Sequence, residues 1–472
     1  MTAGDLAAAI ARREVSPVDA VEAALERAEE TEPSLNAFVQ VDADGAMAAA
    51  RRAESDVLGG NPLGPLHGVP VSVKDLIDVR GLKATYGSLT RKDAVATADA
   101  PSVERLRASG AIILGKTTTS ELGYRGYTNS LVHGNTRNPW DMGRTPGGSS
   151  GGAVASVAAG VSALALGTDG GGSVRAPSSL TGLVGIKANF ARVPVWPASA
   201  TPTLAHVGPI ARTVGDAALL LSVCAGPDAR DPFSLMLPIG DVPPPEHVRS
   251  LRVAFSPTLG YARVEEPVAT AVASAVKKLQ AVFADIELVE QVCADEGEIL
   301  AAEFIGGCSA RLGDTVDTAP DLIDPPLLAA IRAFRATTTD SFTRLLRRRL
   351  QHRETMRQFF EHYDLLLTPT TPCTAWDIKR GLPPGHENAI VWSYFTYPFN
   401  LTGQPAGSLP CGLSPEGLPI GLQFVVPLGD EARLICAMRA AEAVLGAVCP
   451  TPIEPDATRR LPDGSASDGM MP

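Results

Sequence analysis

GGSSGGAVASVAAGVSALALGTDGGGSVRAP, residues 147–177, is the least random stretch of this 472-residue chain. Its run of small residues at 153–160 predicts a helix that packs very close to a sheet, and the apolar run at 162–167 predicts a buried strand. Glycine-rich turns flank both elements. A strand, helix and strand alternation that is joined by glycine turns is typical of an α/β fold.

The same alternation continues on both sides of this stretch. Val69, Val71 and Val73 alternate with other residues along a strand that ends at Lys74-Asp75. Further predicted elements are a helix at 102–108, strands at 111–114, 251–255, 364–367 and 417–426, and helices at 264–283 and 431–445. We therefore predict a single large α/β domain with a central mixed, twisted β-sheet that helices cover on both faces.

We expect this domain to span residues 1–454. Its expected parts are an N-terminal helical segment at 1–60, a catalytic core at 61–225, a helical cap or substrate region at about 297–362, and the C-terminal part of the core at 363–454. The Pro-rich piece 238–245 is the best candidate linker, and it need not separate independent domains. The polar tail 455–472 lacks periodicity and is expected to be disordered.

The composition excludes several classes of function. A net charge of −11 disfavours a nucleic acid or an anionic membrane surface as the main partner. Hydrophobic residues make up 45% of the chain and charged residues 20%, so a sizeable core is expected and wholesale disorder is excluded. No apolar run approaches the ~18–20 residues of a membrane span. The first residues also lack the basic and apolar regions of a secretory signal.

Cysteine and histidine usage argues against a metal site. The seven cysteines are scattered without a CxxC pair, and the seven histidines include no HExxH motif. This pattern predicts free thiols in a reducing cytoplasm, no disulfide framework, and no metal or other cofactor. The expected partner is therefore a small molecule.

The serines of the two glycine-rich stretches are placed for acyl transfer. Glycine lets the backbone approach a ligand closely, and successive N–H groups beside a hydroxyl make an anion hole next to a nucleophile. A phosphate cradle is one alternative, but neither stretch matches GxxxxGK[ST] or a good GxGxxG. A set of purely structural turns is the other. Two such stretches and an upstream Lys-Asp strand end argue against it.

Several segments match one known family. They are Val71-Ser72-Val73-Lys74-Asp75, Thr136-Arg137-Asn138-Pro139-Trp140, 147–152 and 167–177, with weaker matches at 368–372, 410–412 and 419–423. On these motifs, which together span about residues 5–446, the chain resembles the amidase signature family. The resemblance implies the amidase signature fold and an amidase, a hydrolase of carbon–nitrogen bonds other than peptide bonds. Dimers are common among these proteins, which leaves a homodimer open.

The resemblance assigns catalytic roles to three side chains. It implies Ser173 as the nucleophile, Ser149 as a bridging serine that follows a cis peptide bond, and Lys74 as the base; the spacing of 24 selects Ser149 and not Ser150. An ordinary lysine, with a pKa of about 10.4, is neutral only about one part in a thousand near pH 7. We therefore expect Lys74 to be buried, with its pKa lowered.

The expected proton path joins these groups by hydrogen bonds. Ser173 is expected to pass its proton to Ser149 and then to Lys74, from which it returns to the leaving amine. The N–H groups of Gly170, Gly171, Gly172 and Ser173 are expected to hold the oxyanion. An acyl-enzyme on Ser173 then releases the acid to water.

Three further polar residues flank these groups. For Asp169, Arg175 and Ser150 we favour a bracing role in the loop; for Asp169 and Arg175 a contact with substrate is the alternative. Lone histidines such as His67 and His206 more often serve structure than substrate binding.

By resemblance, the acyl-binding residues come from 123–129, 194–206 and 392–400. The aromatic residues in these segments are Tyr124, Tyr127, Trp196, Trp392 and Tyr397. An aromatic pocket suits an aryl or extended apolar group. For each residue, an ordinary place in the core is the alternative.

The leading hypothesis is a stand-alone amidase for aryl or extended apolar amides, with esters and carbamates also open. The alternative within the family is the glutamine-hydrolysing A subunit of a tRNA-dependent amidotransferase. Aligning 396–400 places Ser393 where that protein has an acid, and its Arg-Arg…Gly segment has no clear equivalent. A catalytically inactive ligand-binding scaffold is an alternative of another class, and the intact triad argues against it.

Overall fold

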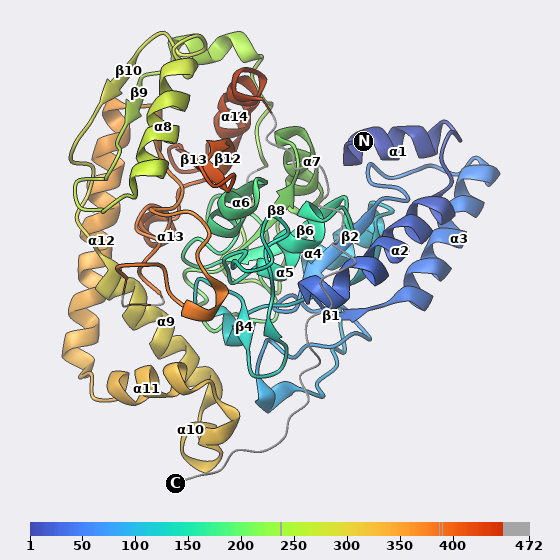
Figure 1. Ribbon diagram of the computed structural model, residues 1–472, viewed down its shortest axis with the longest axis horizontal. Helices are drawn as coiled ribbons and strands as arrows, with labels where there is room; N and C mark the ends of the chain where they lie inside the picture. Colours follow the sequence, from blue (N-terminus) through green and yellow to red (C-terminus); the bar gives the residue numbers. More distant parts are fainter. Residues whose placement is uncertain (237, 387, 389, 447–472) are drawn as a thin grey trace.

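A mixed sheet of eleven strands forms the centre of the computed structural model, which describes residues 1–446 apart from 237, 387 and 389 (Figure 1). The strand order is β1-β3-β2-β6-β8-β7-β12-β13-β11-β9-β10. These strands are β1 Phe38–Val41, β2 Pro70–Lys74, β3 Ile112–Thr117, β6 Leu164–Asp169, β7 Val184–Lys187, β8 His206–Ala211, β9 Val253–Phe255, β10 Ile286–Leu288, β11 Leu365–Pro369, β12 Ala406–Leu413 and β13 Pro419–Val425. A separate pair joins β4 Asn129–Ser130 to β5 Gly134–Asn135.

Strand direction in this sheet brings two functionally important chain segments together. β2 lies between β3 and β6 and is parallel to both, whereas β6 and β8 are antiparallel. Because parallel strands end at the same edge, the last residues of β2 and β6, Lys74 and Asp169, lie at neighbouring strand ends. This edge of an α/β sheet is where ligands commonly bind.

Helices cover both faces of the sheet. The described helices are α1 Ala3–Ala11, α2 Pro17–Leu35, α3 Ala43–Gly59, α4 Pro101–Ala108, α5 Gly151–Ala158, α6 Arg175–Thr181, α7 Val214–Cys224, α8 Glu266–Leu279, α9 Gly297–Leu312, α10 Thr315–Thr318, α11 Pro325–Phe334, α12 Thr339–His362, α13 Pro398–Thr402 and α14 Glu431–Leu445. Short 3₁₀ turns are η1 Leu89–Arg91, η2 Glu121–Gly123, η3 Pro245–Ser250, η4 Pro320–Leu322 and η5 Ile378–Arg380. In this part of the chain, no helix combines the length and the apolar character needed to cross a membrane.

The two faces have separate apolar cores. Residues of α4, α7, α8 and α14 pack in the largest core cluster. On the opposite face, α5 packs on β6 and β8, and α2 and α3 pack beside it on β3. This arrangement confirms the predicted α/β fold with a mixed sheet between helical layers.

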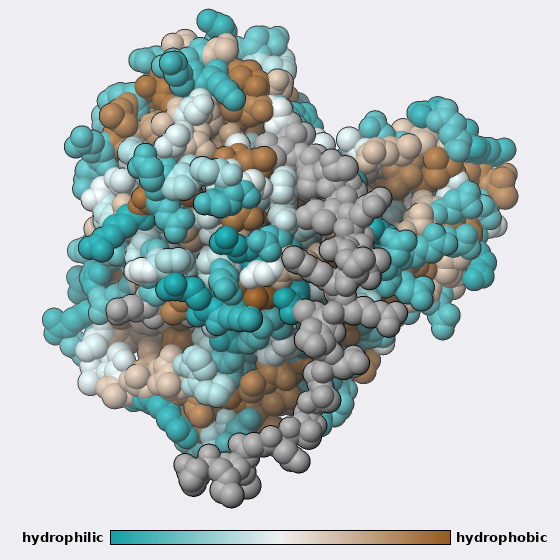
Figure 2. All heavy atoms as spheres, viewed as in Figure 1, coloured by the Kyte–Doolittle hydropathy of each residue, from teal (hydrophilic) through white to brown (hydrophobic). Residues whose placement is uncertain are grey.

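Helices α9 to α12 form a lateral layer at one side of the sheet (Figure 1). This confirms the helical character predicted for 297–362. Hydrophilic residues cover most of the face in Figure 2, with smaller apolar patches between them. The layer matters for the site because α9 brings Phe304 against Gly170, where an added Cβ would lie 3.0 Å from the phenyl ring.

Several predicted boundaries differ from the structure. β3 continues to Thr117, beyond the predicted end at 114, because Gly115 and Lys116 keep pairing with β2. Helix α8 spans 266–279 instead of 264–283, and it begins with a proline in its first turn. The segment 1–60 also contains β1, which pairs antiparallel with β3. The predicted tail 455–472 lies outside the described residues.

Candidate active site

Lys74 is a fully buried lysine surrounded by hydroxyl groups. Its Nζ lies 2.8 Å from Oγ of Ser149, 2.9 Å from Oγ of Ser150 and 2.8 Å from Oγ1 of Thr168. Among the described residues, no carboxylate lies within ion-pair distance of this amine. Burial lowers the pKa of Lys74 well below its ordinary 10.5, and the more distant charges of Asp169 and Asp75 only partly oppose the shift. A neutral amine in this position can accept a proton.

Ser149 and Ser150 both reach Lys74 but have different surroundings. Both residues precede α5, and the Gly148–Ser149 peptide bond is cis. Ser149 lines a cavity, whereas the Ser150 hydroxyl donates to the carbonyl of Thr168 at 3.1 Å and accepts from the Thr168 N–H. Of the two serines that contact the lysine, only Ser149 also lines the cavity, which Thr168 lines as well.

Ser173 lies in the same cavity wall as Ser149 and is 9% exposed. Within the described part of the chain, its hydroxyl has no hydrogen-bond partner, so the expected bond between Ser173 and Ser149 is not formed in this structure. Catalytic hydrogen bonds are often long or poorly aligned in apo structures and tighten in the Michaelis complex. The hydroxyl of Ser173 therefore remains available to a bound molecule.

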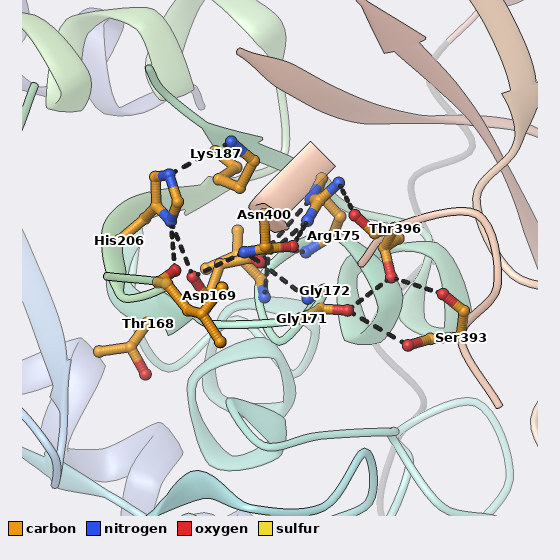
Figure 3. Close-up of polar contacts among 12 residues, drawn as sticks. Thr168, Asp169, Gly171, Gly172, Arg175, Lys187, His206, Ser393, Thr396 and Asn400 are labelled. Atoms are coloured by element: carbon orange, nitrogen blue, oxygen red, sulfur yellow. Dashed lines mark hydrogen bonds and ion pairs between the residues drawn. The ribbon is translucent and has the colours of Figure 1, made fainter. Parts of the chain in front are cut away.

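A buried ion pair holds the loop that carries Ser173 (Figure 3). Arg175 contacts both carboxylate oxygens of Asp169, at 2.9 and 3.0 Å, and both residues are fully buried. Arg175 also donates to the side chains of Asn400 and Gln423 and to the carbonyl of Thr396. Burial alone would raise the pKa of Asp169, but the charge and hydrogen bonds of Arg175 hold it below its ordinary value. These contacts tie the loop to α13 and β13.

The peptide unit between Gly171 and Gly172 is fixed at both ends. The Gly171 carbonyl accepts from Oγ1 of Thr396 at 2.8 Å and from Oγ of Ser393 at 3.2 Å, while the Gly172 N–H donates to Oδ1 of Asp169 at 2.8 Å (Figure 3). Gly172 has a φ of +127°, and an added Cβ would lie 2.1 Å from Oγ1 of Thr396. Glycine is therefore required at this position.

This geometry departs from the expected oxyanion role of Gly172, because its N–H is directed at a carboxylate. In the described residues, the N–H groups of Gly170, Gly171 and Ser173 have no acceptor within the protein. Gly170 and Gly171 are half-buried, whereas Gly172 is buried. Three of the four expected donors thus remain available.

Comparison with known proteins identifies the family. The family model described as Amidase matches residues 19–435 of this chain. The chain belongs to the amidase family. Its relatives include an acylamidase of Rhodococcus erythropolis, which is 35% identical and aligns over 94% of this chain and 95% of its own length. The family and these relatives show that the chain is an amide-hydrolysing enzyme.

Two other relatives bear on the kind of amidase. The A subunit of the glutamyl-tRNA(Gln) amidotransferase of Acidothermus cellulolyticus is 36% identical, over 94% of each chain. The crystal structure of a bacterial aryl acylamidase of the amidase signature enzymes superposes with a TM-score of 0.88 at 28% identity, over 96% of each chain. The amidase signature resemblance is thereby confirmed.

Two cavities of this amidase meet at Ser173. The larger encloses about 770 Å³, counted to its open mouth, and its apolar lining includes Leu76, Ile77, Tyr86, Trp196 and Phe304. The smaller spans about 310 Å³, also counted to its open mouth, and is lined in part by Tyr124, Gly126, Leu300 and Trp392. A hydroxyl at this junction can face a carbonyl whose two substituents extend into different cavities.

The five aromatic residues expected in the pocket are divided between cavity and core. Trp196 lines the larger cavity, and Tyr124 and Trp392 line the smaller one. Tyr127 and Tyr397 line neither cavity: the Tyr127 hydroxyl accepts from Arg125, and the fully buried Tyr397 donates to Asp295. The contacts of these two residues fit the alternative, in which they belong to the core and not to the pocket.

Sequence reasoning missed Tyr86 and Phe304 in the larger cavity. Neither lies in a segment that the family resemblance marks; Tyr86, in the loop after β2, and Phe304, on α9, meet only because they pack in one apolar cluster. His206 also lines this cavity, with Nδ1 near the carbonyls of Leu204 and Asp169, whereas His67 contacts the carbonyl of Ala53. In the part of the chain that the structure describes, no group of three or more His, Cys, Asp or Glu side chains is placed to hold a metal ion.

Proposed function

We propose that this amidase cleaves aryl or extended apolar amides through an acyl-enzyme on Ser173, with Ser149 and Lys74 as its proton relay. One observation carries the proposal: the 2.8 Å contact between Nζ of Lys74 and Oγ of Ser149, in the wall of the cavity that Ser173 also lines. Since burial lowers the pKa of Lys74, the relay ends at a neutral amine.

In the first step, Oγ of Ser173 attacks the amide carbonyl carbon. Its proton passes to Oγ of Ser149 while the Ser149 proton passes to Nζ of Lys74. The carbonyl oxygen becomes an oxyanion, and the free N–H groups of Gly170, Gly171 and Ser173 are the proposed donors to it. Each such donor contributes roughly 10²–10³ in rate.

The tetrahedral intermediate then collapses. The C–N bond breaks, and the proton held by Lys74 returns through Ser149 to the leaving nitrogen, which departs as a neutral amine. Water attacks the ester on Ser173 and passes a proton to the same relay. The acid leaves and the Ser173 hydroxyl is restored, so each step uses only groups of this chain and water.

The apolar lining of the larger cavity supports an aryl or extended apolar substituent. The names of the relatives, acylamidase and aryl acylamidase, agree with this substrate class. Esters and carbamates offer the same carbonyl chemistry, and we include them in the proposal. We also propose a cytoplasmic location, supported by the six described cysteines, none of which forms a disulfide.

A second candidate is glutamine hydrolysis, which the amidotransferase relatives favour. Against it stands Ser393, which lines the smaller cavity beside Ser173 and is bonded to the carbonyl of Gly171. A neutral hydroxyl at this position gives no charge partner for the ammonium group of glutamine.

A panel of anilides, primary amides, esters, carbamates and glutamine tests the proposal. Hydrolysis of anilides well above that of glutamine is the expected result. Hydrolysis of glutamine alone would replace the proposal by the second candidate. If nothing is turned over and a fluorophosphonate fails to label Ser173, the chain is a ligand-binding scaffold.

A further inference from the structure

Arg311 is a charged residue in the lining of the larger cavity. It lies in the last turn of α9, is exposed, and places its guanidinium carbon 5.5 Å from the ring centroid of Tyr86. Tyr86 and Arg311 both line the cavity. Arg91 approaches the same ring at 4.3 Å, so two positive charges surround one cavity-lining aromatic ring.

Within the described residues, neither Arg311 nor Arg91 forms an ion pair with a carboxylate. Arg311 has neither a hydrogen bond nor a carboxylate within ion-pair distance, and the cavity lining contains no Asp or Glu. Asp78 contacts the same tyrosine: its carboxylate accepts from the hydroxyl of Tyr86 at 2.8 Å. It makes no ion pair with either arginine. The cavity is therefore mostly apolar in its lining, without a carboxylate, and positive at this position.

The helix sets the distance between this charge and the proposed reaction centre. Phe304 and Arg311 are seven residues apart on α9, two turns, and therefore share one face of the helix. Phe304 lies against Gly170 in the proposed oxyanion loop. At 1.5 Å per residue, the backbone position that carries the guanidinium lies roughly 10 Å further along the helix axis than Phe304.

We propose that Arg311 binds an anionic group at the far end of the substrate. The preferred amide would then carry a carboxylate, or a similar anion, roughly 10 Å from the scissile carbonyl, with an apolar spacer between them. A guanidinium binds a carboxylate through two parallel N–H groups, and its contact with Tyr86 holds it in place for this. The inference rests on the proposed function, because it takes this cavity as the substrate site.

A purely structural role for Arg311 is the competing explanation, since a cation in the last turn interacts favourably with the helix dipole. Arg332 provides a matched control. It is also exposed, in the last turn of α11, and without a carboxylate partner among the described residues, but it does not line the cavity.

The test uses two pairs of substrates. One pair is the para-nitroanilide of a medium-chain dicarboxylic acid and its distal methyl ester; the other is an acyl anilide of 4-(4-aminophenyl)butanoic acid and its methyl ester. In Arg311→Gln, the ratio of kcat/KM for the anionic over the neutral member should fall about fivefold in at least one pair. Arg311→Lys should retain part of the preference, and added salt should weaken it in the wild type. Arg332→Gln should leave the ratio unchanged.

An unchanged ratio in both pairs for Arg311→Gln, or an equal fall in Arg332→Gln, overturns the inference. Calorimetric binding of the same compounds to Ser173→Ala separates this outcome from failure of the proposed function. If the wild type turns over none of them, but the anionic compounds bind Ser173→Ala about fivefold more weakly once Arg311→Gln is added, only the proposed reaction fails. If no compound binds, the inference falls as well.

Discussion

Nζ of Lys74 lies 2.8 Å from Oγ of Ser149, and both groups are buried. The amine is also 2.9 Å from Oγ of Ser150, so distance to the lysine does not distinguish the two serines. Their other contacts do. Ser149 faces the cavity with Ser173, whereas Ser150 is bonded to the backbone of Thr168.

Replacement of each serine by alanine tests this difference. Ser149→Ala should lower kcat at least about 100-fold, because it removes the proposed link between Ser173 and Lys74. Ser150→Ala should be milder, because it removes contacts of the lysine and of Thr168 but not the relay. Steady-state kinetics on one anilide substrate gives both values. Near-normal turnover by Ser149→Ala together with severe loss in Ser150→Ala would mean that Ser150, and not Ser149, is the bridging serine.

The pH dependence of the reaction reports on Lys74. The base must be neutral, so kcat/KM should rise as pH increases through the pKa of Lys74 and then level off. Because burial lowers this pKa well below 10.5, the rise should be complete far below that pH. Lys74→Met should cost at least about 10³-fold in kcat/KM and remove this limb. A limb centred near 10.5 would mean that the lysine is not desolvated in solution.

The Asp169–Arg175 pair should contribute strongly to stability. Asp169→Asn leaves the fully buried Arg175 without its charge partner, a loss of about 3–5 kcal/mol in the free energy of unfolding. Asp317→Asn is the control, since Asp317 pairs with Arg335 at the surface and should cost no more than about 1 kcal/mol. Urea denaturation measures both values. Equal effects would contradict the bracing role.

Two aromatic substitutions separate the cavity from the core. Trp196→Ala should raise KM more for aryl amides than for acetamide, because Trp196 lines the larger cavity. Tyr397→Phe should lower stability by about 1–3 kcal/mol through the lost hydrogen bond to Asp295 without changing this preference. KM values for the two substrates and the unfolding midpoints give the comparison. A change of substrate preference in Tyr397→Phe would mean that Tyr397 contacts the substrate after all.

The sequence predicts those parts of the site that depend on local patterns and on the spacing of motifs along the chain. The apolar alternation at 69–73 predicts the strand that ends at Lys74, whereas β6 ends at Asp169, two residues beyond the predicted 167. The choice of Ser149 over Ser150 comes from the family resemblance, through its spacing of 24 residues. The partners of Arg175 could not be predicted in this way. Asn400 and Gln423 lie more than 200 positions away, on α13 and β13, and meet Arg175 only through tertiary packing.

The orientation of individual groups is also hidden from the sequence. The direction of the Gly172 N–H depends on Asp169 on one side and Thr396 on the other. Aromatic identity predicts burial for Tyr397 but does not say whether the ring faces a cavity or the core. Tyr86 and Arg311 meet at the larger cavity because the loop after β2, which carries Tyr86, packs in one apolar cluster with α9.

The site of covalent modification tests the central claim most directly. The purified enzyme is treated with a fluorophosphonate and digested, and the modified peptide is identified by mass spectrometry. The account predicts a single adduct on Ser173, abolished in Ser173→Ala and strongly slowed in Ser149→Ala. An adduct on another serine, or equal labelling of Ser173 without Ser149, would contradict it.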